Sequence, residues 1–171
     1  TQPMAGIYIH IPFCKQACSY CDFHFSTNQK LQTDLTQALC TEIEVRGKEL
    51  TTELDTIYFG GGSPSILTNT NLSMIFGALQ GSFDLGHVRE ITLESNPDDH
   101  SAAQLDFWKS LGINRLSIGI QSFIERDLIL MNRAHNVNQA ADCVANAKRA
   151  GFEKLTIDLI YGIPDQSLKE W

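Results

Sequence analysis

The sequence contains no run of lysine and arginine residues, and its acidic side chains outnumber its basic ones. With 13 Lys and Arg against 20 Asp and Glu, the formal net charge is -7 at pH 7. Proteins that bind nucleic-acid phosphates or anionic lipid surfaces present a basic face. We therefore expect no nucleic-acid partner.

Long apolar runs, linkers and low-complexity stretches are also missing. The apolar runs, such as the one around residues 157–160, have the length of a strand and fall far short of a membrane span. No charged-then-apolar leader opens the chain, so we expect a cytoplasmic protein. With 171 residues, 43% of them apolar, the sequence predicts one globular domain over residues 1–171, which we expect to be incomplete from the count of its strands and helices.

Short apolar strands alternate with helical segments along the chain. Period-two patterns predict strands at residues 6–11, 55–59, 90–94, 115–120 and about 155–160. Apolar spacing and capping residues predict helices from residue 31 onward, over 65–79, over 101–112, over about 138–150 and from 164 onward. Such alternation predicts a parallel sheet with right-handed crossovers.

This pattern indicates an α/β fold, for which two architectures are open. We favour a partial (β/α) barrel of TIM type with parallel strands, and a doubly wound open sheet is the alternative. Five βα units fall short of the roughly eight that close the standard barrel, so we expect a truncated barrel. The free edge of the fifth strand is then expected to be exposed or covered by a neighbour.

Three of the five cysteines, Cys14, Cys18 and Cys21, lie on one short loop directly after the first strand. An odd cysteine count in a chain expected to be cytoplasmic does not indicate a disulfide framework. Three thiolates on one loop can hold three irons of a cubane iron–sulfur cluster, which leaves the fourth iron open to an exogenous ligand. The alternative is a structural zinc site with His10 or His24 as fourth ligand.

Polar residues follow several of the expected strands. Glycines 60–62 end the second strand and would let the backbone approach a ligand closely. A phosphate loop is excluded, because no Gly-Lys-Ser/Thr follows. Glu94, Gln121 and Asp158 each stand at or near the end of an apolar strand, where (β/α) barrels carry their active sites. Any one of them could instead cap a helix, but three on successive strands favour a site.

Other candidate ligands are expected to be structural. Cys40 and Cys143 fall within predicted helices, where a cysteine is usually a small core residue. His10 shares a strand face with Tyr8 and is expected to be buried and hydrogen-bonded. The histidines at 87, 100 and 135 fall in expected loops without a visible partner.

Several motifs together resemble the radical S-adenosylmethionine superfamily. They are Tyr8-Ile-His-Ile-Pro-Phe-Cys14, the x3/x2 cysteine spacing with Tyr20 before its third cysteine, and Gly60-Gly-Gly-Ser-Pro64. Within the superfamily the chain is most similar to the oxygen-independent coproporphyrinogen III oxidases and their heme-chaperone relatives. Residues 94–97, 118–123, 130–133 and 158–164 carry this finer likeness, and the resemblance covers the chain from about residue 5 to 164.

The resemblance implies that Cys14, Cys18 and Cys21 ligate a [4Fe-4S] cluster whose open iron binds S-adenosylmethionine. An electron from the reduced cluster then cleaves the sulfonium bond, giving methionine and a 5′-deoxyadenosyl radical that abstracts hydrogen. The electron would come from a donor such as a flavodoxin or ferredoxin. The positions matching the family's contacts to S-adenosylmethionine are Tyr8, Tyr20, Gly61, Gly62, Ser63, Glu94, Gln121, Arg133 and Asp158.

One position distinguishes two branches of this group. The oxidases resemble Cys-x3-Cys-x2-Cys-x-Cys, whereas Phe23 stands here in place of the fourth cysteine. Cys21-Asp22-Phe23 resembles the heme-chaperone branch, which implies a radical SAM protein of heme and porphyrin metabolism whose whole form binds heme. The alternative is an oxidoreductase that decarboxylates coproporphyrinogen III to protoporphyrinogen IX. No catalytic side chain is assigned in either case.

Overall fold

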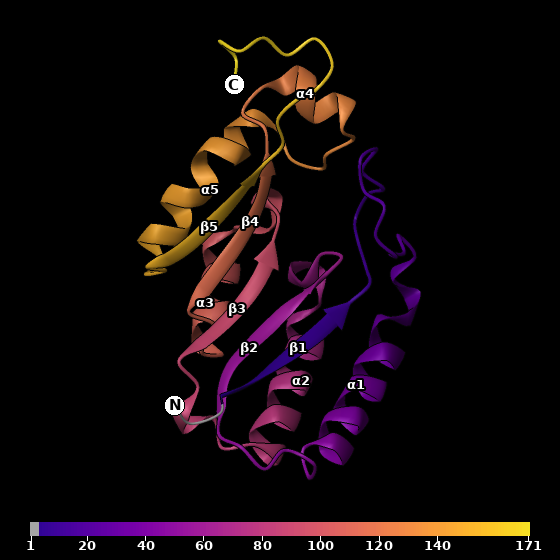
Figure 1. Ribbon diagram of the computed structural model, residues 1–171, viewed down its shortest axis with the longest axis vertical. Coiled ribbons are helices and arrows are strands. Elements are labelled where there is room, and N and C mark those ends of the chain that lie inside the picture. The colour runs from indigo at the N-terminus through magenta and orange to yellow at the C-terminus, as the bar shows by residue number, and fades with distance from the viewer. Residues whose placement is uncertain (1–3) are drawn as a thin grey trace.

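A computed structural model describes residues 4–171 of the chain, which form a curved parallel sheet with helices outside it (Figure 1). All strand pairs are parallel, and the strand order in space follows the order in sequence. The five strands lie within two residues of the ranges predicted from period-two patterning. They are β1 (Ala5–Ile11), β2 (Leu54–Gly61), β3 (Glu90–Ser95), β4 (Arg115–Gln121) and β5 (Lys154–Leu159).

The sequential strand order decides between the two expected architectures. A doubly wound sheet needs a point at which the strand order reverses, and none occurs among the described strands. With right-handed crossovers and no reversal, every connecting helix falls on the same side, as in a (β/α) barrel. The partial barrel is therefore confirmed. Its helices are α1 (Gln32–Arg46), α2 (Asn69–Ser82), α3 (Ala102–Ser110), α4 (Glu125–Leu130) and α5 (Val137–Arg149).

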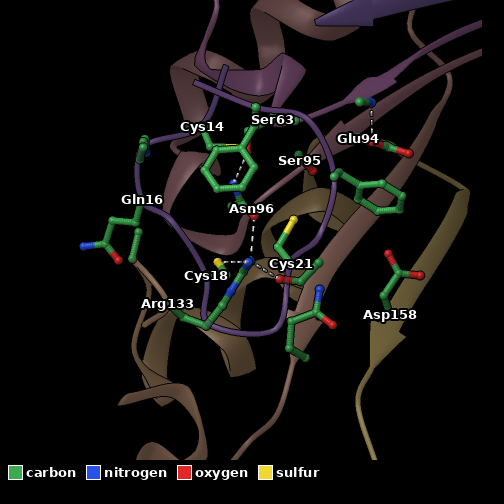
Figure 2. A pocket seen from close by; sticks show the side chains of 18 of the residues that line it. Cys14, Gln16, Cys18, Cys21, Ser63, Glu94, Ser95, Asn96, Arg133 and Asp158 are labelled. Atoms are coloured by element: carbon green, nitrogen blue, oxygen red, sulfur yellow. Dashed lines mark hydrogen bonds between the residues drawn. The ribbon is translucent and has the colours of Figure 1, made fainter. Parts of the chain in front are cut away.

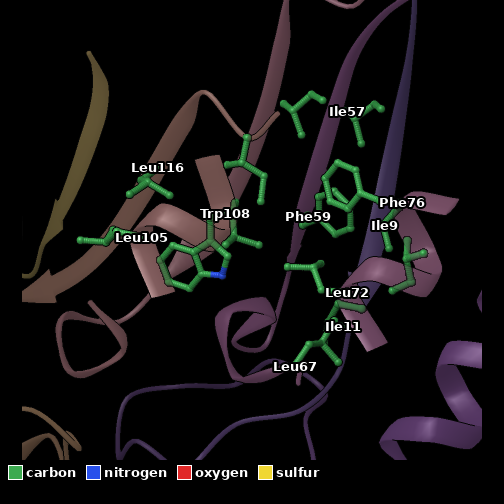
Figure 3. Packing of buried hydrophobic residues seen from close by; sticks show 14 of the residues in the cluster. Ile9, Ile11, Ile57, Phe59, Leu67, Leu72, Phe76, Leu105, Trp108 and Leu116 are labelled. Atoms are coloured by element: carbon green, nitrogen blue, oxygen red, sulfur yellow. The ribbon is translucent and has the colours of Figure 1, made fainter. Parts of the chain in front are cut away.

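One apolar core lies between the sheet and its outer helices (Figure 3). Alternate strand residues such as Ile11 and Phe59 point into it and are fully buried. Phe59 stacks on Phe76 of α2, with ring centroids 5.4 Å apart, and Trp108 of α3 is completely buried. Because each strand gives one face to this core, its other face carries the polar residues toward the inside of the arc.

One helix prediction needs correction at its start, and one helix was missed. The second helix begins at Asn69 and not at Ser65, because the Thr68 side chain accepts the Asn71 N–H (3.2 Å) as its N-cap. Ser65 instead lies in a short 3-10 helix, η2 (Pro64–Ile66), and its hydroxyl donates to Asp99. The sequence also misses α4, whose six residues are too few to show a helical period.

The helix expected from Pro164 onward is absent between residues 160 and 171, which form turns. Gly162 and Asp165 have left-handed φ angles of 75° and 61°, which an α-helix does not accept. Leu168, expected to begin an apolar stripe, is 95% exposed and packs against no core. The expected open edge lies at β5, which pairs with β4 alone among the described strands, and its Ile157 and Leu159 are each 40% exposed. No helix in the described range is long and apolar enough to cross a bilayer.

Three histidine predictions are wrong in detail. His10 is exposed, not buried, and shares a hydrogen bond with the Tyr8 hydroxyl (3.2 Å), because its strand face points into the open arc. His100 and His135 are buried with partners: Ser95 Oγ lies 2.8 Å from His100, and the Ile120 carbonyl 3.0 Å from His135. Burial against neighbouring strands is invisible to local sequence patterning.

Candidate functional site

The carboxyl ends of the strands and the cysteine loop enclose one cavity of about 190 Å³ (Figure 2). In a parallel sheet these ends meet at one edge, so residues far apart in sequence converge there. Eleven of the twelve residues predicted from sequence line this cavity. They are Cys14, Cys18, Tyr20, Cys21, Gly61, Gly62, Ser63, Glu94, Gln121, Arg133 and Asp158.

Tyr8 is the exception. It lies on β1, one strand beyond Tyr58, and stacks on the Tyr58 ring with centroids 5.9 Å apart. It does not line the cavity. Its pKa is raised, first by burial and then by the charge of Glu94. The structure therefore places Tyr8 beside Glu94 and the glycine turn, but outside the lining of the cavity.

The cysteine loop, residues 12–26, is tied at its base by backbone hydrogen bonds. Ser26 N–H donates to the Pro12 carbonyl (2.8 Å), and Cys14 N–H donates to the Ser26 carbonyl (3.0 Å). The three cysteines are free and partly buried. Burial raises the pKa of Cys14, a hydrogen bond with Ser63 lowers it, and the neighbouring Cys21 and Cys18 raise it. All three thiols line the same cavity.

The donor set fits a cluster better than a single ion. In the described part of the chain, no three His, Cys, Asp or Glu side chains are gathered closely enough to hold one metal ion. Neither His10 nor His24 lines the cavity, so neither histidine expected to complete a zinc site is in place there. In a cubane cluster each thiolate binds a different iron, so three spaced thiols from one loop are suitable ligands.

The three consecutive glycines let the turn after β2 pack closely against the cysteine loop. A Cβ atom on Gly62 would stand 2.6 Å from the Phe13 carbonyl oxygen and 2.9 Å from Cys14 Sγ. Gly61 has a φ of +113°, which side-chain-bearing residues rarely adopt. Ser63 N–H donates to the Phe13 carbonyl (2.7 Å), so the glycine turn and the cysteine loop are joined directly.

Glu94 presents a carboxylate that two neighbours hold in place. The Tyr58 hydroxyl donates to Oε1 (2.7 Å) and the Gly61 N–H donates to Oε2 (3.2 Å). Burial raises the pKa of Glu94 above its ordinary value, and Asp158 raises it further, while both hydrogen bonds oppose this. Sequence reasoning missed Tyr58, although the period of β2 places it on the inner face of the sheet.

Arg133 connects the cysteine loop to the strand ends (Figure 2). Its Nη1 donates to Cys18 Sγ (3.2 Å) and to the Tyr20 hydroxyl (3.1 Å). Its Nη2 donates to Asn96 Oδ1 (2.7 Å) and to the Gly119 carbonyl (2.8 Å). Its buried Nε has no hydrogen-bond partner within residues 4–171. Asn96 was not predicted as a site residue, yet it lines the cavity and holds Arg133 there.

Gln121 reaches the cavity through an irregular backbone. Its φ of 68° is left-handed, and the register between β4 and β5 shifts between Gly119 and Gln121. A bulge of this kind re-aims a side chain at the end of a strand. A Cβ atom on Gly119 would lie 3.0 Å from the Gln121 side-chain nitrogen, so Gly119 leaves space for this arrangement.

The family model of the radical SAM superfamily matches residues 8–171. The chain belongs to the radical SAM superfamily. Membership implies use of a [4Fe-4S] cluster and S-adenosylmethionine, in agreement with the motifs of the sequence.

Curated relatives give a finer likeness. The chain is 34% identical to the heme chaperone HemW of Escherichia coli, over 98% of this chain and 45% of that protein. It is 38% identical to the heme chaperone HemW of Bacillus subtilis, over 97% of this chain and 45% of that protein. The chain therefore spans less than half the length of these relatives.

Solved structures agree on the fold. Coproporphyrinogen III oxidase HemN from Escherichia coli, a radical SAM enzyme, is similar with a TM-score of 0.89 at 31% identity. That likeness covers 99% of this chain and 39% of the oxidase chain. An archaeal Elp3 from Methanocaldococcus infernus shares the fold at a TM-score of 0.64 and 18% identity.

Proposed function

We propose that this chain is the cofactor-binding part of a heme chaperone-like radical SAM protein. One observation carries the proposal: three free thiols from one loop and polar side chains from four strand ends line a single cavity. The likeness to curated HemW chaperones and the presence of Phe23 at the position of the oxidases' fourth cysteine support this branch.

In this proposal Cys14, Cys18 and Cys21 hold the cluster and leave one iron free for S-adenosylmethionine. When bound and reduced, the cluster supplies the electron that cleaves the sulfonium bond. The protein's own part is to bind the cofactor, orient it and keep water away. The partial burial of the thiols, and their enclosure by a loop joined directly to the glycine turn, suit that part.

The polar lining suits the zwitterionic methionine end of the cofactor. Glu94 and Asp158 lie on one side of the cavity and can receive an ammonium group. Gly61, Gly62 and Ser63 also line the cavity, and the Gly61 N–H is bonded to Glu94. Arg133, which lies across the cavity, can receive a carboxylate. Tyr20 stands beside Arg133 and offers an aromatic face for adenine, and burial raises its pKa to about 12, so it stays neutral.

Anaerobic reconstitution tests the cofactor assignment. The protein is refilled with iron and sulfide in a glove box, desalted, and assayed for iron, acid-labile sulfide and zinc. We expect about four irons and four sulfides per chain, as a [4Fe-4S] cluster requires. Stoichiometric zinc without sulfide would overturn the cluster in favour of a structural metal site.

The second candidate is the decarboxylating oxidase, which the similarity to HemN favours. The two are separated in the whole protein, reduced and supplied with S-adenosylmethionine. Tight stoichiometric heme binding without turnover of coproporphyrinogen III supports the chaperone. Formation of protoporphyrinogen would establish the oxidase instead.

We further propose a cytoplasmic location and reduction by a small electron donor such as a flavodoxin or ferredoxin. The five thiols, odd in number and unpaired, support a reducing compartment. An acceptor of electrons needs an accessible site, and the cavity has three partly exposed cysteines at its wall. To test the donor, the reconstituted protein is mixed with reduced flavodoxin or ferredoxin, and reduction of the cluster is measured as a loss of its visible absorbance.

A further inference from the structure

The tip of the cysteine loop is held by a turn more than 100 residues away in sequence. Ser19 N–H donates to the Met131 carbonyl (3.1 Å) and Ser19 Oγ donates to the Leu130 carbonyl (2.9 Å). The Asn132 side-chain amide donates to the Ala17 carbonyl (2.8 Å). These contacts bring residues 17–20 against residues 130–133, beside α4 at the upper end of the molecule (Figure 1).

That turn is itself rigid. Three backbone hydrogen bonds of 2.9 to 3.0 Å fold the chain back on α4. They run from the N–H groups of residues 131, 132 and 133 to the carbonyls of residues 127, 129 and 128, respectively. Leu128 and Met131 are buried in a small second core. Asn132 has a left-handed φ of 54°, a conformation that asparagine tolerates better than most residues.

The other end of the loop is held separately. Lys15 forms ion pairs with Asp98 and Asp99, which lie in η4 (Pro97–Asp99) after β3. Cys14 N–H is bonded to Ser26 and not to the turn. Loss of the Asn132 contact would therefore weaken the hold on the Cys18 side of the loop, where the Ser19 and Arg133 bonds remain, and leave the Cys14 side unchanged.

We propose that residues 130–133 form a positioning element, with Asn132 as its positioning residue, that places Cys18 before any cluster binds. This inference rests on the proposed role of Cys18 as a cluster ligand. A ligand loop that is already ordered loses less conformational freedom when it binds, so its complex is retained more strongly. The contribution of Asn132 is to fix the backbone at Ala17, one residue before that ligand.

Two substitutions isolate this contribution. Asn132→Asp keeps the shape of the side chain but turns a carboxylate oxygen toward the Ala17 carbonyl. Asn132→Gly keeps the left-handed backbone and removes the side-chain amide. It provides the same test if Asn132→Asp folds poorly. Asn138→Asp makes the same charge change on an exposed residue of α5 and is the matched control.

The first measurement uses the cluster-free protein and follows amide hydrogen exchange at single residues. Ser19 N–H, which is bonded to the turn, is expected to exchange about tenfold faster in both Asn132 variants. Cys14 N–H is expected to change less than twofold, and Asn138→Asp is expected to match the wild type at both amides. Unchanged exchange at Ser19 in both Asn132 variants would overturn the positioning element.

The second measurement uses reconstituted protein and follows the rate at which a chelator removes iron. We expect several-fold faster iron loss from both Asn132 variants than from the wild type and from Asn138→Asp. If the Asn132 variants exchange faster at Ser19 but lose iron at the wild-type rate, the turn holds the loop without stabilising the bound cluster, and the proposed role in cluster retention is overturned. A wild type that takes up no iron and sulfide would overturn the proposed function and this role with it, while Ser19 exchange would still decide whether the turn holds the loop.

Discussion

At the scale of single residues, the site consists of side chains whose positions are fixed by neighbours. Glu94 is the clearest case, since Tyr58 Oη and the Gly61 N–H each donate to one of its oxygens. A carboxylate held in this way keeps its charge directed into the cavity without reorganisation when a cation binds. In the proposed site Tyr58 would therefore act through Glu94, because it does not line the cavity itself.

Removing the Tyr58 hydroxyl tests this arrangement. Tyr58→Phe is expected to weaken S-adenosylmethionine binding about tenfold, because a hydrogen bond to a charged group contributes roughly 1.5–3 kcal/mol. The Tyr58 bond lowers the pKa of Glu94, so its loss raises that pKa. As the pH is lowered, the variant should therefore lose S-adenosylmethionine binding at a higher pH than the wild type does. Calorimetric titrations of both reconstituted proteins at several pH values measure this.

The matched control for this substitution is Tyr161→Phe, because Tyr161 is 78% exposed and lines none of the site. It should bind S-adenosylmethionine as the wild type does over the same pH range. A Tyr58→Phe protein with wild-type affinity and an unshifted profile would show that Glu94 does not depend on this hydroxyl.

Two cysteines provide a second comparison at this scale. Cys18→Ala is expected to lose the cluster, whereas Cys143→Ala should keep it, because Cys143 is 1% exposed within the core and its burial raises its pKa to about 11. The core substitution should instead cost about 1 kcal/mol in free energy of unfolding. Iron content and thermal unfolding of both variants measure this, and equal iron content would refute the ligand assignment.

At the scale of elements, His100 joins three segments of the fold. Ser95 Oγ, at the end of β3, lies 2.8 Å from Nε2, and the Cys143 carbonyl in α5 lies 3.4 Å from Nδ1. A carbonyl only accepts, so Nδ1 carries the proton and Nε2 accepts from the serine hydroxyl. The ring also meets Trp108 of α3 edge-on at 5.8 Å.

This burial makes stability depend on pH. Burial lowers the pKa of His100, and of His135, below the ordinary value of 6.5. Below about pH 6.5 these two histidines bind protons in the unfolded chain but stay neutral in the folded chain. The free energy of unfolding should therefore fall as the pH drops below about 6.5. His100→Gln should flatten this dependence in part. Urea unfolding of cluster-free protein near pH 7.5 and 5.5 measures it, and an identical slope in the variant would contradict it.

Elements with a clear local signal could be predicted from sequence, and the others could not. The strands were identifiable because one face is buried, which imposes a period of two, as at Ile9 and Ile11 in β1. The predicted helix after Pro164 failed because Gly162 and Asp165 adopt left-handed backbone conformations that the apolar spacing does not reveal. The six residues of α4 depend on the buried contacts of Leu128 and Met131, which become visible only in three dimensions.

The residues of the candidate site also divide into those that have a local signal in the sequence and those that do not. Strand-end residues such as Gln121 and Asp158 could be grouped from sequence, because parallel strands bring their carboxyl ends together. Tyr58 could not, since it acts through Glu94 on a neighbouring strand. Asn96 lines the cavity, but its bond to Arg133 joins segments far apart in sequence and has no local signal. Tyr8 matched a motif, yet its side chain contacts His10 and Tyr58 at the rim instead of the cavity.

At the scale of the whole molecule, strand order explains why a site exists at all. Sequential parallel strands place their helices on one side, so the other face of the sheet is left to polar and small residues. The cysteine loop closes that face at its carboxyl end, held by Lys15 on one side and by residues 130–133 on the other. The fold thereby gathers three thiols, two carboxylates and a guanidinium in one cavity.

The central claim is that this one cavity holds the cluster and S-adenosylmethionine in direct contact. Electron–nuclear double resonance tests it on the reconstituted, reduced protein mixed with S-adenosylmethionine that carries a ¹⁵N-labelled amino group. The account predicts a ¹⁵N coupling to the cluster spin, absent when the label is omitted. A cluster spectrum that S-adenosylmethionine leaves unchanged, with no ¹⁵N coupling, would contradict it.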